Sequence, residues 1–231
     1  MSVRIPSLPA DATAQEILRQ GVEAAKGIVK LACSFSLEDT VIIDMIHKEG
    51  LPVGIFALDT GRLNEETYEV ADAITDRYGI RIDWYFPKNE AVEKLEREKG
   101  LHSFRESLEN RHECCGIRKV EPLGRALAGL AGWVTGLRRE QSVTRTDLAA
   151  IEIDESHGGI LKLNPLLEWS EEQVWDYATQ HHVPVSRLYD QGYRSIGCAP
   201  CTRAVAPGEH ARAGRWWWED PEHKECGLHR K

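Results

Sequence analysis

The sequence predicts an α/β fold in which a mostly parallel sheet is covered by helices on both faces. Short apolar runs alternate with longer segments of helical periodicity through the first part of the chain. Such alternation implies right-handed crossovers and parallel strand pairing. A chain of 231 residues with 42% hydrophobic and 29% charged residues has the size and composition of a globular protein with a substantial core. We therefore expect a Rossmann-like domain.

The first half of the chain contains three strand–helix pairs. Thr13 and Glu16 have the spacing of a capping box, which opens the first helix, and Gly27 ends it. The second helix carries Val41 and Met45 at helical spacing and ends near Gly50. We expect strands over 28–33, 53–58 and 80–86. We expect helices over 13–26 and 64–78, and between them the second helix, which follows the turn 34–39 and ends near Gly50.

The second half is expected to continue the same domain and then become irregular. Pro122 leaves the first half of a helix over 114–130 uncertain, and Ser170 with Gln173 forms a second capping box. The other expected elements are a charged helix over 89–99, a strand over 133–135, and a hairpin of 149–153 with 160–163. After Arg187 the chain is rich in Gly, Pro and charge. We expect a nucleotide-binding domain over 1–190 and a C-terminal arm over 191–231.

Charge and hydropathy exclude several classes of protein. A net charge of −8 argues against a general nucleic-acid-binding protein, which would usually be basic. The longest apolar run, 51–58, is too short to span a bilayer, and the N-terminal residues lack the apolar core of a secretion signal. We expect a cytoplasmic protein without nucleic-acid or membrane partners, in which paired cysteines serve metal or redox chemistry rather than disulfides.

The ligand of such a fold is expected beyond the carboxyl ends of the strands. Three loops follow those ends, over 34–39, 59–62 and 136–140, and Ser34 and Ser36 lie where a phosphate-binding turn is expected. The chain contains neither the dinucleotide-binding Gly-x-Gly-x-x-Gly pattern nor the nucleotide-hydrolysing Gly-x4-Gly-Lys-Ser/Thr pattern. Dinucleotide and ATP hydrolysis chemistry therefore gain no support.

Four cysteines in two pairs, Cys114-Cys115 and Cys198-x-x-Cys201, can supply four thiolates to zinc or to a [4Fe–4S] cluster. Adjacent cysteines converge on one centre only in a helical or strained backbone. A cuboidal cluster, whose irons lie at separate corners, accommodates them more readily than zinc does. The spacing leaves zinc open, as well as buried thiols or a disulfide. Cys226 remains as a separate thiol.

Several motifs resemble the assimilatory adenylyl-sulfate reductases, the cluster-bearing branch of the sulfonucleotide reductase family. The resemblance runs from Ile28 to His229 and rests on the segments 58–62, 114–123, 136–142, 198–203, 214–219 and 224–229. It implies the adenine-nucleotide alpha-hydrolase-like variant of the Rossmann-like fold. It also implies assimilatory reduction of adenosine 5′-phosphosulfate (APS) to sulfite and AMP.

The resemblance assigns roles to individual cysteines. It implies a [4Fe–4S] cluster on Cys114, Cys115, Cys198 and Cys201. The tail thiol, Cys226, is the implied nucleophile: it attacks the sulfur of APS, AMP leaves, and an S-sulfocysteine remains on the enzyme. Thioredoxin or a glutaredoxin-like dithiol protein then releases sulfite. Only a thiolate is a competent nucleophile for this attack.

Substrate contacts are expected in both halves of the sequence. By resemblance, basic residues hold the phosphosulfate, and Arg suits this because its planar fork binds such oxygens in pairs. Backbone groups at Leu58 and Gly136 are implied to recognise the adenine, and Arg138 belongs to the same nucleotide-side motif as Gly136. The full set of expected substrate residues is Ser34, Ser36, Leu58, Lys119, Gly136, Arg138, Arg212, Arg215 and His229.

Three alternatives stay open. Within the family, the substrate could be the 3′-phosphorylated nucleotide (PAPS), alone or together with APS, although reductases restricted to PAPS typically lack the four cysteines. A nucleotide-activating tRNA-thiolating enzyme can share the fold and a cluster, and a zinc-stabilised binding module would need no catalysis. The sequence does not decide the oligomeric state, and a homo-oligomer is among the options.

Overall fold

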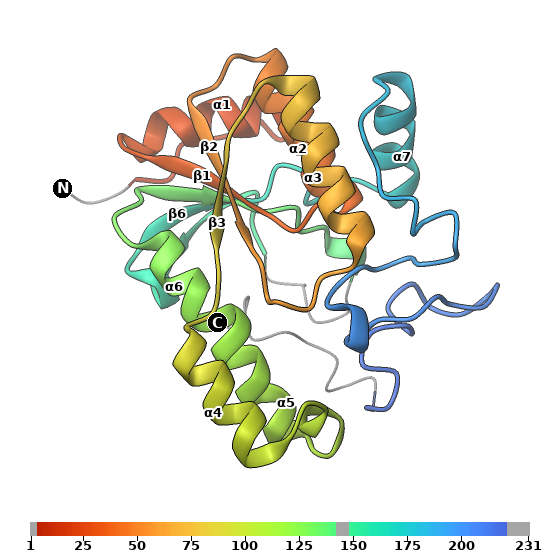
Figure 1. Ribbon diagram of the computed structural model, residues 1–231. Helices are drawn as coiled ribbons and strands as arrows, with labels where there is room; N and C mark the ends of the chain where they lie inside the picture. Colours follow the sequence, from red (N-terminus) through yellow and green to blue (C-terminus); the bar gives the residue numbers. More distant parts are fainter. Residues whose placement is uncertain (1–3, 142–147, 221–231) are drawn as a thin grey trace. The chain divides into compact units, whose positions relative to one another are not determined.

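The computed structural model describes residues 4–141 and 148–220 and contains a six-stranded sheet in the order β3-β2-β1-β4-β6-β5 (Figure 1). Strand β1 pairs in parallel with β2 and with β4, and β4 pairs in parallel with β6. Edge strand β5 is antiparallel to β6. The strands are β1 (Val29–Cys33), β2 (Val53–Leu58), β3 (Ile82–Tyr85), β4 (Gly132–Val134), β5 (Ile151–Asp154) and β6 (Ile160–Leu163). The predicted mostly parallel α/β fold is confirmed.

Seven α-helices and five short helical turns connect these strands in the described chain. The helices are α1 (Ala14–Ala25), α2 (Leu37–Lys48), α3 (Glu65–Tyr78), α4 (Asn89–Lys99), α5 (Leu108–Cys115), α6 (Glu121–Leu127) and α7 (Glu171–Gln180). The short turns are η1 (Ser103–Arg105), η2 (Gly116–Val120), η3 (Arg139–Gln141), η4 (Glu155–His157) and η5 (Ala199–Cys201).

Both predicted capping boxes are present. The Thr13 hydroxyl accepts from the Glu16 amide at 3.2 Å, and the Thr13 amide donates to the Glu16 carboxylate at 2.7 Å. Ser170 and Gln173 exchange the same two bonds at 3.2 and 2.8 Å. These side chains satisfy amides that have no partner inside a helix, so helix starts of this kind can be located from sequence.

The segment expected to form a helix over 114–130 differs from the prediction. The helical stretch begins earlier, at Leu108, because the Ser107 hydroxyl caps the amide of Asn110 at 3.1 Å. It then widens into η2, a turn of π-helix, before α6 begins. Pro122 lies in the first turn of α6, directly after this π-helical turn.

The predicted hairpin of β5 and β6 is present, but its second strand has a larger role than expected. The pairing is antiparallel, with Ile151 opposite Leu163 and Asp154 opposite Ile160. On its other edge β6 pairs in parallel with β4, with Val134 opposite Leu163. Strand β6 is therefore an interior strand of the sheet, and β5 is the edge.

The chain divides into two compact units, each of which is described by itself. Unit 1 comprises 1–57, 66–83 and 129–186; its core includes the fully buried Leu31, Val134 and Leu161. Helix α1 packs on β6, and α2 packs on β1 and against α7. Unit 2 comprises 58–65, 84–128 and 187–231. The division expected from sequence, at residues 190 and 191, stays a prediction.

Unit 2 has a small core of its own. Leu95 of α4 and Cys114 of α5 pack with Phe104, so these two helices lie side by side (Figure 1). Ile117, Cys201 and Trp218 cover this cluster and are partly buried. Among the residues that the structure describes, no helix is long and apolar enough to cross a membrane.

Candidate functional site

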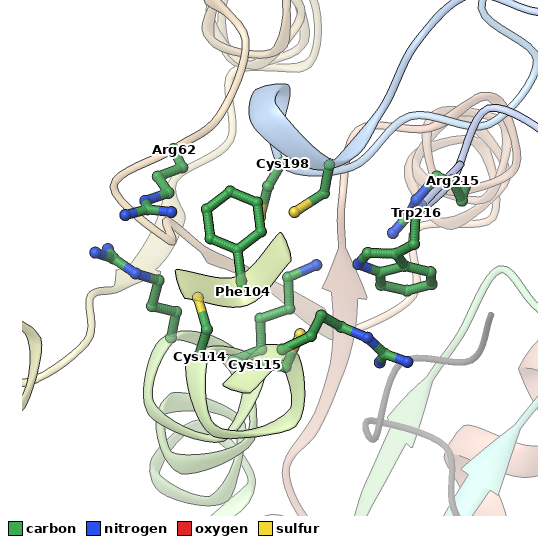
Figure 2. Close-up of a pocket in the computed structure, with 11 residues that line it drawn as sticks. Arg62, Phe104, Cys114, Cys115, Cys198, Arg215 and Trp216 are labelled. Atoms are coloured by element: carbon green, nitrogen blue, oxygen red, sulfur yellow. The ribbon is translucent and has the colours of Figure 1, made fainter. Parts of the chain in front are cut away.

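All four paired cysteines line one pocket of unit 2 (Figure 2). Its volume is about 380 Å³, including the part open to solvent. Five cationic side chains and two aromatic rings complete the lining, namely Arg62, Arg111, Arg118, Lys119, Arg215, Phe104 and Trp216. The structure thus brings together cysteines that are more than 80 residues apart in the chain, with positive charge around them.

Cys114 and Cys115 are the last two residues of α5. In a helix, adjacent side chains are rotated by only about 100°, so both can lie toward one side, whereas in a strand they would point to opposite faces. Figure 2 shows the two thiols projecting from this helix toward the turn that carries Cys198. The helical setting that sequence reasoning required for adjacent cysteine ligands is therefore present.

Cys198 directly precedes the single turn η5, and Cys201 is the last residue of that turn. The Cys201 amide donates to the Cys198 carbonyl at 2.9 Å, which folds the two cysteines toward each other. The loop 59–62 holds this turn from one side: Thr60 Oγ1 lies 3.3 Å from Cys198 Sγ, and the Ala199 amide donates to the Arg62 carbonyl at 2.8 Å. A loop that resembled a nucleotide-side motif is thus also a support of the cysteine pocket.

Residues of the C-terminal arm also support the turn η5. The Trp216 amide donates to the Cys201 carbonyl at 3.0 Å, and Thr202 and Arg215 form a β-bridge. A Cβ atom on Gly214 would lie 2.2 Å from the Arg203 carbonyl oxygen, so this close approach requires glycine. This arrangement positions Arg215 and Trp216, which line the pocket.

Two glutamates partly neutralise the cationic lining. Glu96 accepts from Arg118 at 2.7 Å and from Arg62 with the same oxygen. Glu219 accepts two hydrogen bonds from Arg111, at 2.9 and 2.8 Å. Among the described residues these two carboxylates pair with three of the five lining cations, and a lining so rich in cations favours anionic contents.

Burial raises the pKa of two of the pocket thiols, Cys114 and Cys201. Burial raises the pKa of Cys114, while the positive charges of Arg62 and Arg118 oppose the shift. Burial and the neighbouring Cys198 raise the pKa of Cys201 to about 12, against the influence of Lys119. Without a positively charged centre these thiols stay protonated at neutral pH, and a metal centre would deprotonate them.

Three nitrogen donors of the pocket residues are buried and have no hydrogen-bond partner within the described chain. They are Arg118 Nε, Arg215 Nε and Trp216 Nε1, and the buried oxygen Glu96 Oε2 shares this property. Buried donors are rarely left unsatisfied in native proteins. The pocket therefore suits a group rich in hydrogen-bond acceptors, such as sulfide and thiolate sulfur. Over the same residues, no three Cys, His, Asp or Glu side chains are placed to hold a single metal ion.

The predicted phosphate turn of unit 1 is built around Asp39. This carboxylate accepts from the Ser34 amide at 2.6 Å, from the Ser34 hydroxyl at 2.7 Å and from the Ser36 hydroxyl at 3.3 Å. Burial raises the pKa of Asp39 to about 6. Phe35, between the two serines, has a φ of 60°, a left-handed conformation that favours glycine, and its buried side chain keeps it there. Ser36 occupies the N-cap position of α2 without a side-chain capping bond, and the N-terminus of this helix favours an anion.

Arg138 and Gly136 pack against the same turn of unit 1. Arg138 is buried and donates to Glu38 at 2.9 Å and to Glu140 at 3.0 Å. A Cβ atom on Gly136 would lie 2.4 Å from Asp39 Oδ1, so only glycine fits. Sequence reasoning missed both Glu38 and Asp39. Their position in the first turn of the helix after Ser34-x-Ser36 is the signal that could have identified them.

Comparison with known proteins places these features in a family. Residues 28–204 match the phosphoadenosine phosphosulfate reductase domain. The protein belongs to this reductase family. Within the family it is 50% identical to adenosine 5′-phosphosulfate reductase of Allochromatium vinosum, over 99% of this chain and 91% of that protein. It is 53% identical to the protein of that name from Burkholderia cepacia, over 87% of this chain and 80% of the relative.

Solved structures of the reductase family and of other proteins share the fold. A phosphoadenylyl-sulfate reductase from Candida auris, in a phosphate complex, superposes with a TM-score of 0.71 at 32% identity, over 87% of this chain and 99% of that one. FMN adenylyltransferase from Candida glabrata, with FAD and pyrophosphate, gives a TM-score of 0.53 at 12% identity, covering 95% and 80% of the two chains. The second likeness concerns the fold alone, and it agrees with the adenine-nucleotide alpha-hydrolase-like architecture.

The predicted site residues not yet described are Leu58, Arg212, Cys226 and His229. Leu58 ends β2, and Arg212 is half-buried in the tail with its amide donating to His210 Nδ1 at 3.2 Å. Cys33, the last residue of β1, is a buried thiol, and burial raises its pKa. Cys226 and His229 lie outside the described residues.

Proposed function

We propose that this protein reduces adenosine 5′-phosphosulfate to sulfite and AMP. The observation that carries the proposal is the pocket of four cysteines inside a cationic lining, in a chain about half identical to adenosine 5′-phosphosulfate reductases. Reductases restricted to the 3′-phosphorylated nucleotide typically lack this cysteine set, which favours APS. The likeness to the Candida auris reductase keeps PAPS as the second candidate substrate.

The cofactor we propose is a [4Fe–4S] cluster held by Cys114, Cys115, Cys198 and Cys201. Two observations support the fit: four thiols line one pocket, and buried nitrogen donors there lack partners among the described residues. Cluster sulfurs are acceptors that such donors can satisfy, and hydrogen bonds to them tune a cluster. When bound, the cluster would supply a fixed charge that tunes the pocket.

The bond-forming residue we propose is Cys226. Its thiolate attacks the sulfur of the phosphosulfate, a sulfur–sulfur bond forms, and AMP leaves with the electron pair of the broken sulfur–oxygen bond. The enzyme is left as an S-sulfocysteine. A dithiol protein such as thioredoxin then attacks Cys226 Sγ, releases sulfite, and becomes a disulfide once its second thiol resolves the mixed disulfide.

The cations of unit 2 are proposed to hold the phosphosulfate. Lys119 and Arg215 line the cysteine pocket, and Arg212 belongs to the same tail. His229 completes this set by resemblance. The Arg215 guanidinium is fixed by a 3.0 Å hydrogen bond to the Ile196 carbonyl, and a Cβ on Gly197 would lie 2.6 Å from it. Such fixation lowers the entropy cost of binding an anion.

The nucleotide contacts we propose in unit 1 are the Ser34–Asp39 turn, the backbone at Gly136, and Arg138. Helix α2 begins at this turn, and a helix N-terminus favours phosphate. In the structure Arg138 is paired with Glu38, so its proposed role is to position the loop 136–141 as well as to add positive charge. Leu58, at the end of β2, is proposed as a backbone contact to the adenine.

One experiment tests both chemistry and residue. The protein is incubated with APS, or separately with PAPS, without a reductant, and the tail peptide is analysed by mass spectrometry. We expect APS to add one SO3 group to Cys226, and thioredoxin to release it as sulfite. Cys226→Ser should form no adduct yet keep its iron. A strong preference for PAPS, ATP consumption with RNA binding, or zinc in place of iron would each overturn the proposal.

A further inference from the structure

We propose that the buried ion pair of Arg111 and Glu219 is a positioning device that holds the two cysteine pairs together and anchors the tail. The inference rests on the proposed function, because it concerns the pocket assigned there to the cluster. In the sequence Glu219 is only the last residue of the 214–219 motif and Arg111 belongs to no motif, and neither is a substrate contact or a cluster ligand in the proposal above.

The pair joins the helix of the first cysteine pair to the tail. Arg111 precedes Cys114 by three residues and Cys115 by four, so all three lie on one face of α5. Its guanidinium lies next to the Cys115 thiol as well as Glu219. The two hydrogen bonds to Glu219, Nε to Oε1 at 2.9 Å and Nη2 to Oε2 at 2.8 Å, form a bidentate contact with fixed orientation.

A short chain of contacts continues from Glu219 to the second cysteine pair. The Glu219 amide donates to the Trp216 carbonyl at 2.9 Å, and the Trp216 amide donates to the Cys201 carbonyl at 3.0 Å. The Trp216 ring lies 4.6 Å from the Arg111 guanidinium and 4.7 Å from that of Arg215. Arg111 therefore contacts Cys115 of the first cysteine pair directly. It is connected to Cys201 of the second pair through Glu219 and Trp216.

The backbone of Trp216 is strained, which shows that the surrounding contacts hold this segment in place. Its φ is 40°, in the left-handed region that side chains other than Gly rarely adopt, and its ring is 1% exposed. A strained residue persists only where its surroundings over-determine it. Stacking on Arg111 and the turn closed by Glu219 supply that constraint.

The pair is buried, which is unusual for charged side chains. Burial also lets a role in positioning be distinguished from a contribution to the stability of the protein. The side chain of Arg111 is 0% exposed and that of Glu219 is 8% exposed. A buried ion pair is a poor source of net stability, because desolvation offsets attraction, and an apolar pair of similar volume is often equally stable. What an apolar pair cannot reproduce is the fixed bidentate geometry.

The chain offers a matched control. Arg203 and Glu209 also form a two-bond pair, at 3.1 and 3.1 Å, near the tail of the same unit. Their side chains are 41% and 35% exposed, and Glu209 is not among the pocket residues. Glu209→Gln removes a surface pair without touching the pocket.

The test compares Glu219→Gln, the apolar double variant Arg111→Met with Glu219→Leu, and Glu209→Gln in the iron-loaded full chain. For both pocket variants we expect the amides of Trp216 and Glu219 to exchange hydrogen at least tenfold faster than in the wild type. We also expect a chelator to remove iron at least tenfold faster, and kcat to fall at least tenfold with a much smaller change in KM. Glu209→Gln should match the wild type in all three measurements.

The double variant distinguishes positioning from folding. It should keep a thermal unfolding midpoint close to that of the wild type and still show fast local exchange and fast iron loss. Unchanged local exchange and iron release in Glu219→Gln, or full recovery of both in the double variant, would overturn the inference. An iron-free wild type would instead count against the proposed cluster, and the exchange comparison would still decide whether the pair anchors the tail.

Discussion

The cysteine pocket of unit 2 and the Ser34–Asp39 turn of unit 1 satisfy their polar groups in different ways. In the turn, both serine hydroxyls are hydrogen-bonded to Asp39, and Arg138 is paired with Glu38. In the pocket, Arg118 Nε, Arg215 Nε and Trp216 Nε1 are buried without partners in the described chain. The turn therefore satisfies these polar groups within the described chain, whereas in the pocket the acceptors for the buried donors would come from the proposed bound group. Changes in the pocket should act through that group, and changes in the turn should act on the protein directly.

The largest expected effect tests the dependence of the pocket on its contents. Cys115→Ser should lose its iron and more than 99% of its sulfite production, because metal ligation contributes folding energy as well as geometry, on the order of several kcal/mol. Iron analysis and thermal unfolding measure the two losses. Cys33→Ala, at a buried thiol of unit 1, is the control and should keep its iron. A Cys115→Ser protein with normal iron would break the comparison.

The next largest expected effect is on the pH dependence of the free energy of unfolding, and it tests the Asp39 carboxylate of the turn. Burial raises the folded-state pKa of Asp39 from 3.8 to about 6, so the folded state binds this proton more tightly than the unfolded state. The contribution of Asp39 is therefore most favourable below about pH 4 and declines by up to ~3 kcal/mol as pH rises through about 6. Asp39→Asn should abolish this decline, as measured by urea unfolding at pH 4.5 and 7.

Asp44 of the same helix provides a control of opposite sign for that measurement. Although burial opposes it, hydrogen bonds from Lys48, Tyr177 and Tyr78 lower the pKa of Asp44 below its ordinary value. Its favourable contribution is present at neutral pH and is lost as pH falls through the folded pKa. If Asp39→Asn and Asp44→Asn shifted the pH dependence in the same direction, the contrast between these carboxylates would be wrong.

A smaller effect tests how tightly the turn is packed. Gly136→Ala should destabilise the protein by ~2 kcal/mol, because its Cβ would lie 2.4 Å from Asp39 Oδ1 and 2.9 Å from Glu38 Cβ. Denaturant unfolding gives the free-energy change, and iron content should be unaffected. Gly124→Ala is the control, since its Cβ would meet nothing within 4 Å. Equal effects of the two substitutions would contradict the packing argument.

The smallest expected effect tests the contrast between the pocket and the turn at a single buried donor of the pocket. Trp216→Phe removes a buried donor that lacks a partner among the described residues, so in the iron-free protein it should cost only packing. In the iron-loaded protein it should cost ~1 kcal/mol more, because a hydrogen bond to the bound group is also lost. Thermal unfolding of both forms measures the difference, and the more exposed Trp217→Phe should show none. The same cost in both forms of Trp216→Phe would mean that this donor does not face the group.

Much of the fold could be predicted because its signals are local. A capping box lies within one helical turn, so Thr13 and Ser170 located two helix starts from their own neighbourhood. Strand–helix alternation likewise predicted parallel pairing. The interior place of β6 could not be predicted, since a hairpin pattern fixes its pairing with β5 and says nothing about its other edge.

The sequence by itself determined the chemical components of this protein: two cysteine pairs, a separate tail thiol, and serines at a strand end. The tertiary structure alone decided how their surroundings are paired. It placed Glu219 on Arg111 across 108 residues and made one oxygen of Glu96 serve both Arg62 and Arg118. The physical reason is that charge pairing between distant segments depends on which surfaces the packed core brings together, and neither periodicity nor spacing records it.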